Sequence, residues 1–132
     1  MASPIFDARG IDAKTFAPFT LQNCLATEWE DVRLSFSDWA WFQEKFKTDT
    51  IDDYYMNGYG VEGLVKAVLF AGNIDPDDEE IVYNSEGDAC NIHFKTLAFA
   101  VHAAELSVAM VKNKKTLAAA IVIAREQGFE DS

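Results

Sequence analysis

Basic residues, cysteines and long apolar runs are all scarce in this sequence, and each shortage excludes a class of protein. Only 11 of the 132 residues are Lys or Arg, against 22 Asp or Glu, which gives a formal net charge of −11. Nucleic acids and anionic membranes are bound through basic surfaces, so neither is an expected partner. The apolar runs are far shorter than the roughly 20 residues that cross a bilayer.

The two cysteines, Cys24 and Cys90, are too few for a disulfide framework and lack metal-ligand spacing. The first ten residues have neither the basic segment nor the apolar segment of a signal peptide, so a reduced, cytoplasmic protein is expected. The sequence contains no GxSxG, HExxH or glycine-rich phosphate loop. No cofactor and no metal ion are therefore expected.

The composition is that of a folded domain, because 49% of the residues are hydrophobic and 13% are aromatic. The length suits a single domain over 1–132. Residues 1–15 show no clear period and indicate a loosely ordered N-terminal arm. The negative charge is uneven, since residues 1–90 hold 18 acids and 6 bases. An acidic surface in this part of the chain would attract a basic protein partner.

Apolar residues at every second position predict strands, and apolar residues at helical spacing predict helices in the other segments. Val32, Leu34 and Phe36 alternate with polar residues, which is typical of a half-buried strand. Two hairpins are predicted, at 19–36 and 81–95, the first with a polar turn that contains Trp29. Helices are predicted at 39–46, 61–69, 96–112 and 116–127. The sequence thus predicts an α+β fold with two layers, ββαα–ββαα, in which helices cover one face of a four-stranded antiparallel sheet.

Four pairs of side chains could carry catalysis or bind a metal. Cys90 and His93 lie three positions apart on a strand and therefore face opposite sides. Cys24 could pair with His93 or His102, but no flanking motif supports this. His102 and Glu105 share a helical face, and a polar stripe at the solvent boundary explains them more simply. We therefore expect a protein that is not an enzyme.

The acidic segment 75–80 matches part of a calcium-binding loop. Asp75, Asp77 and Glu79 occupy ligand positions 1, 3 and 5, and Glu86 falls at position 12. However, Glu80 stands where the sharp turn of such a loop needs glycine. A solvated acidic loop is the expected structure.

The segment 52–55 consists of two aspartates followed by two tyrosines. Exposed aromatic residues anchor many interfaces, and neighbouring acids favour a basic partner. The alternative is that Tyr54 and Tyr55 pack beneath the loop. The predicted partner-binding residues are Asp52, Asp53, Tyr54, Tyr55, Tyr59, Asp77, Asp78, Glu79, Glu80 and Trp41.

Several segments together resemble a known family. These are PFTL at 18–21, VRLSFSD at 32–38, WFQEKF at 41–46, NGYGVEGLVKAVL at 57–69 and IVYNSEGDACNIHFK at 81–95. Over residues 18–112 the chain is similar to the immunity protein 51 family of bacterial polymorphic-toxin systems. Asn57-Gly58-Tyr59 and the Glu86-Gly87 turn match the family pattern, while Met56 replaces its first glycine.

The resemblance implies a small cytoplasmic inhibitor that binds a cognate toxin and blocks it without turnover. Toxins that attack nucleic acid are often basic, and an acidic inhibitor would attract them. Two alternatives stay open. One is an acidic adaptor outside toxin systems, and the other is a small enzyme that uses Cys24, His93 or His102.

Overall fold

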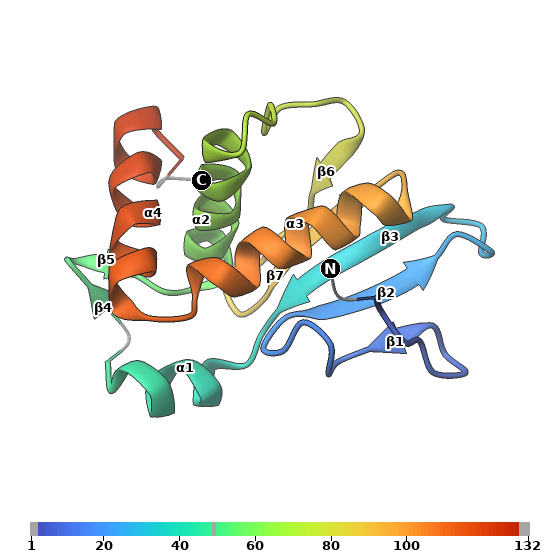
Figure 1. Ribbon diagram of the computed structural model, residues 1–132, viewed down its shortest axis with the longest axis horizontal. Helices are drawn as coiled ribbons and strands as arrows, with labels where there is room; N and C mark the ends of the chain where they lie inside the picture. The colour runs from blue at the N-terminus through green and yellow to red at the C-terminus, as the bar shows by residue number, and fades with distance from the viewer. Residues whose placement is uncertain (1–2, 49, 130–132) are drawn as a thin grey trace.

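The computed structural model describes residues 3–48 and 50–129 and shows an α+β fold built on a five-stranded antiparallel sheet (Figure 1). In spatial order the strands are β1 (Ile11–Asp12), β2 (Thr20–Cys24), β3 (Asp31–Phe36), β7 (Cys90–Phe94) and β6 (Ile81–Tyr83). A separate two-stranded ribbon consists of β4 (Thr50–Ile51) and β5 (Tyr54–Tyr55). The helices are α1 (Trp39–Phe46), α2 (Gly58–Ala71), α3 (Leu97–Met110) and α4 (Lys114–Gln127).

The central strands β3 and β7 follow the predicted period of two. Val32 lies opposite Phe94 and Leu34 opposite Ile92, and all four side chains are fully buried. The intervening residues, including Arg33 and its neighbour His93 on β7, face the other side of the sheet and are only half-buried. The apolar face of these two strands is the floor of the core.

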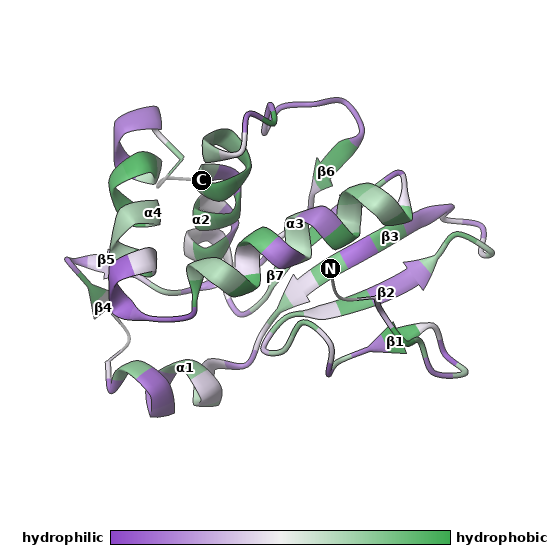
Figure 2. Cartoon of the chain, viewed as in Figure 1, coloured by the Kyte–Doolittle hydropathy of each residue, from purple (hydrophilic) through white to green (hydrophobic). Residues whose placement is uncertain are grey.

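Helices α2 and α3 pack against this floor, and α4 packs against α2 and α3. Helix α3 crosses β2, β3 and β7, and its inner side carries Ala100, Ala103 and Ala104 with no exposed area. Their small side chains allow the helix to lie close to the sheet. Helix α2 contacts α3, α4 and β7. The loop between α2 and β6 contains the acidic segment 75–80 and is largely hydrophilic (Figure 2). Most of this segment is exposed.

The predicted number of strands is wrong, and the ββαα–ββαα layout is only approximate. A fifth strand, β1, lies in the segment 1–15, which the sequence indicated as a loose arm, and Ile11 pairs with Gln22. Two residues are too short to show a period, so the sequence pattern could not reveal this strand. The ribbon β4–β5 also separates α1 from α2, which breaks the expected repeat.

The start of α4 also differs from the prediction, which assigned Lys114 and Lys115 to the break after α3. The two lysines form the first turn of α4. Asn113 caps the helix, because its side chain accepts the Thr116 N–H while the Thr116 hydroxyl accepts the Asn113 N–H. This capping box outweighs the unfavourable placement of two cations at the positive end of a helix dipole.

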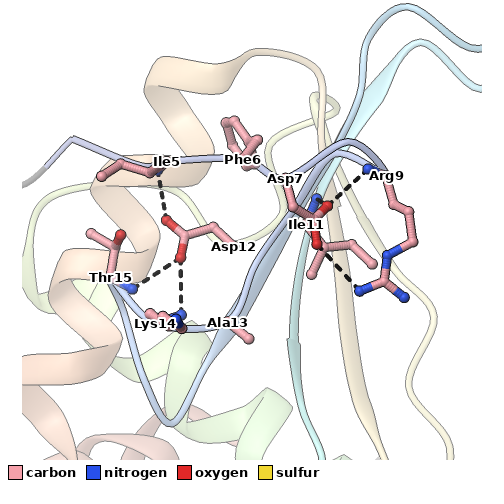
Figure 3. Close-up of a pocket in the computed structure, with 9 residues that line it drawn as sticks. All are labelled: Ile5, Phe6, Asp7, Arg9, Ile11, Asp12, Ala13, Lys14 and Thr15. Carbon is pink, nitrogen blue, oxygen red and sulfur yellow. Dashed lines mark hydrogen bonds and ion pairs between the residues drawn. The ribbon is translucent and has the colours of Figure 1, made fainter.

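Asp12 fixes the N-terminal segment against the sheet (Figure 3). Its carboxylate is 3% exposed and accepts the backbone N–H groups of Ile5 (2.8 Å), Lys14 (2.9 Å) and Thr15 (3.0 Å). Burial alone would raise the pKa of Asp12, but the hydrogen bonds from Thr15, Ile5 and Lys14 lower it to about 2. Asp12 is one of nine residues between Ile5 and Thr15 that line a pocket of about 500 Å³.

None of the helices in the described part of the chain combines the length and the apolar character that a membrane span requires.

We predict that Asp12→Asn lowers the free energy of unfolding by about 1–3 kcal/mol. Both carboxylate oxygens accept hydrogen bonds from backbone N–H groups, and the amide nitrogen of asparagine cannot accept one. The pKa of about 2 lies below the ordinary value of 3.8, so this stabilisation is present above pH 4 and is lost as the pH falls towards 2. Urea unfolding of both proteins between pH 2 and 7 measures it. Asp88→Asn removes the same charge from an exposed side chain and should change little. Equal effects of the two variants would contradict the prediction.

Candidate functional site

The predicted acidic and aromatic segment forms a tight turn between β4 and β5. Ile51 pairs with Tyr54, so the turn consists of Asp52 and Asp53 alone, and both have positive φ (52° and 64°). Two-residue hairpin turns with this backbone favour Asn-Gly, because a side chain at positive φ is sterically strained. Both aspartates are exposed. The chain therefore presents two adjacent carboxylates at a position where Asn-Gly would fold with less strain.

Arg125 of α4 holds this turn from a distant part of the chain. Its guanidinium donates to the backbone carbonyl of Asp52 at 2.6 Å and lies 5.9 Å from the centre of the Tyr54 ring. The carboxylates of Asp52 and Asp53 stay exposed, because Arg125 bonds to the backbone of Asp52 and not to its side chain. Sequence analysis did not single out Arg125, because the contact spans 73 positions and nothing local predicts it.

The two tyrosines of β5 have different environments. Tyr54 is 2% exposed, and its hydroxyl donates to the Gly60 carbonyl at 2.6 Å, so it packs beneath the turn as the alternative interpretation proposed. Its side chain is not available to a partner in this structure. Tyr55 is 59% exposed and Tyr59, on the first turn of α2, is 39% exposed. These two, with Asp52 and Asp53, make up the surface that we call the β4–β5 site.

The motif Asn57-Gly58-Tyr59 starts α2, and it touches the second motif of the family resemblance. Asn57 caps the helix by accepting the Gly60 N–H at 2.7 Å. The Gly58 N–H donates to the Gly87 carbonyl at 3.0 Å. A Cβ atom at Gly58 would collide with the carbonyl oxygens of Glu86 and Ala89. The two motifs therefore form one backbone contact, which has a structural role.

The remaining predicted partner residues lie elsewhere. In the loop before β6, Asp77, Glu79 and Glu80 are exposed and Asp78 is half-buried, with its carboxylate accepting the Glu80 N–H at 2.8 Å. Trp41 on α1 is half-buried beside Phe46 and lines a groove of about 580 Å³. The structure thus assigns the predicted residues to three separate places.

The acidic loop does not converge on a metal site. Asp75 accepts the N–H of Asp77 at 2.9 Å, and Pro76 accepts the Tyr83 hydroxyl at 2.6 Å. Burial and the nearby carboxylate of Glu62 raise the pKa of that hydroxyl. Among residues 3–48 and 50–129, no group of three or more His, Cys, Asp or Glu side chains is arranged to hold a metal ion.

The candidate nucleophiles lie apart from the candidate bases. Cys90 is buried in the core, which raises the pKa of its thiol to about 12. His93 faces the opposite side of β7, as the strand period predicts, and donates from Nδ1 to Asp31 at 3.1 Å. Cys24 is buried at the end of β2, while His102 is exposed on α3. The described contacts pair no cysteine with a histidine.

We predict that Gly58→Ala destabilises the fold by more than 2 kcal/mol, because the new methyl group meets backbone atoms that cannot move aside. Gly87→Ala is the matched control, since a Cβ atom there meets nothing within 4 Å. In an ordinary helix position, Gly→Ala would instead stabilise by about 1 kcal/mol. Chemical unfolding of both variants provides the comparison, and a neutral Gly58→Ala would contradict the close contact.

Comparisons of the chain with protein-family models, with curated proteins and with solved structures gave no match.

Proposed function

We propose that this chain is a cytoplasmic immunity protein, which binds a basic toxin made by the same bacterial cell and neutralises it without catalysis. The observation that carries the proposal is the turn at Asp52 and Asp53. Two charged residues occupy a strained backbone there, although Asn-Gly would fold with less strain. Strain that the surrounding structure maintains is often found at functional positions.

The surroundings of the turn support the same function. Arg125 and the buried Tyr54 fix the position of the turn. A fixed turn loses less conformational entropy when it binds a partner. Tyr55 adds a large exposed ring beside the carboxylates. Aromatic anchors flanked by charge are typical of protein interfaces and suit a basic partner. The contact between Gly58 and Gly87 supports the family resemblance, because it joins the two segments that carry it.

The direct test is to express the chain with the toxin-like protein encoded by an adjacent gene. We expect a stable complex on size-exclusion chromatography and rescue of cells that express the toxin. A chain that neither binds this protein nor protects the cells is not its immunity protein. A neighbourhood without a toxin gene would favour the acidic adaptor instead.

The double variant Asp52→Asn/Asp53→Gly separates binding from stability. We expect its free energy of unfolding to rise by about 1 kcal/mol, because it introduces the preferred turn residues and removes repulsion between adjacent acids. We also expect roughly tenfold weaker toxin binding, which corresponds to about 1.4 kcal/mol. Calorimetric titration and urea unfolding measure the two effects.

The control for charge is Glu44→Gln/Asp88→Asn, which removes two exposed carboxylates elsewhere and should leave affinity nearly unchanged. Tyr55→Ala should weaken binding without loss of stability, whereas Tyr54→Phe should reduce stability by removing the hydrogen bond to Gly60. The interface lies on the acidic loop instead if Asp52→Asn/Asp53→Gly and Tyr55→Ala both bind the toxin normally while Asp77→Asn/Glu79→Gln binds it more weakly.

A further inference from the structure

Trp29 is the most exposed aromatic side chain among the described residues, at 62%. It lies in the loop between β2 and β3, where the side chains of Glu28 and Glu30 are also exposed. We propose that Trp29 anchors a second protein-binding surface, which takes an arginine side chain of a partner protein against the indole and the carboxylates of Glu28 and Glu30. This surface goes beyond the toxin-binding function proposed above.

The loop holds Trp29 in a fixed position. The Thr27 hydroxyl donates to the Cys24 carbonyl at 2.7 Å and accepts the Trp29 N–H at 3.2 Å. The Glu30 N–H donates to the Thr27 carbonyl at 3.3 Å, and Glu30 has a positive φ of 52°. An exposed aromatic residue on an ordered loop loses little conformational entropy when it binds.

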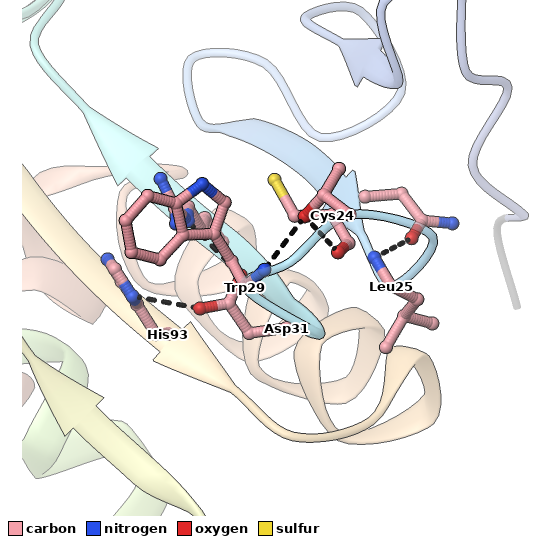
Figure 4. Close-up of polar contacts among 8 residues, drawn as sticks. Cys24, Leu25, Trp29, Asp31 and His93 are labelled. Atoms are coloured by element: carbon pink, nitrogen blue, oxygen red, sulfur yellow. Dashed lines mark hydrogen bonds and ion pairs between the residues drawn. The ribbon is translucent and has the colours of Figure 1, made fainter.

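One side of the indole is already supported by the sheet (Figure 4). The guanidinium of Arg33 lies 5.4 Å from the centre of the Trp29 ring and is paired with Asp31 at 3.1 Å. The second oxygen of Asp31 accepts the Nδ1 proton of His93 at 3.1 Å. Burial and the charge of Arg33 lower the pKa of His93, so the imidazole is neutral at pH 7 and Asp31 balances Arg33.

The other side of the indole faces solvent and fits a planar cation. An aromatic face attracts cations, and arginine stacks on it more readily than lysine because its guanidinium is flat and less strongly hydrated. Glu28 and Glu30 add two carboxylates that can accept its N–H groups. The cation–π contact with Arg33 shows that this indole already accepts a guanidinium on one side.

The surface is separate from the β4–β5 site. The loop between β2 and β3 lies at one end of the long axis of the molecule, and the ribbon β4–β5 lies at the other (Figure 1). A small partner centred on one of them leaves the other open. Variants at the two places therefore test the two proposals independently.

The test follows the three indole N–H signals of the full chain by ¹⁵N NMR during titration with a tetra-arginine peptide. We expect a saturable shift of the Trp29 signal, assigned by Trp29→Phe. The Trp39 indole, which donates to the Asp88 carbonyl, and the Trp41 indole should stay in place. Tetralysine should bind several-fold more weakly, because it cannot stack as a plane.

Trp29→Ala and Glu28→Gln/Glu30→Gln should each reduce the affinity for tetra-arginine roughly tenfold, as expected for a stacked and charge-assisted contact. Glu44→Gln/Asp88→Asn removes the same charge from exposed side chains outside both proposed surfaces and should leave this affinity unchanged. Unchanged binding by Trp29→Ala, or equal binding of the two peptides, would overturn the proposal. Either result would leave the toxin-binding test at Tyr55 unaffected.

Discussion

The fold depends on the close approach of other segments to the N-terminal half of α2, which three glycines permit. Gly58 meets the carbonyls of Glu86 and Ala89, Gly60 meets Tyr55, and Gly63 meets the Phe129 carbonyl and the Tyr54 hydroxyl. A Cβ atom at any of them would collide with one of these neighbours. Glycine costs a helix roughly 1 kcal/mol relative to alanine. Here the cost is offset because the helix contacts the hairpin β6–β7, the ribbon β4–β5 and the segment after α4 at once.

This packing is also what presents the β4–β5 site. Tyr54 can lie beneath the turn because Gly60 and Gly63 leave room for its ring, and its hydroxyl then bonds to Gly60. With Tyr54 inside, the strand period turns Tyr55 outward. Arg125 completes the arrangement from α4 by holding the backbone of Asp52. The contacts of Tyr54 and Arg125 thus fix the backbone that carries the exposed acids. A fixed backbone favours specific binding, because little conformational entropy is lost.

The sequence predicted what regular periods encode and missed what depends on contacts across the chain. The faces of β3 and β7 and the position of α1 at 39–46 were predicted correctly. The strand β1 was missed because two residues show no period, and nothing in the local sequence indicates that they pair with Leu21 and Gln22. For the site, composition pointed to the segment 52–55, but only the structure separates the buried Tyr54 from the exposed Tyr55. Trp29 was placed in a turn without a role, since its support by Arg33 is invisible in the sequence.

The two proposed surfaces share a physical design, and this explains how a strongly acidic chain can discriminate among basic partners. A net charge of −11 attracts any basic protein and mainly raises the rate of encounter. Specific binding needs fixed geometry in addition. At both places acidic residues adopt positive φ beside an exposed aromatic ring, and a buried or stacked group fixes the loop from beneath. In the proposed complexes, charge would bring the partner to the molecule, and the ordered ring would then select the side chain that fits against it.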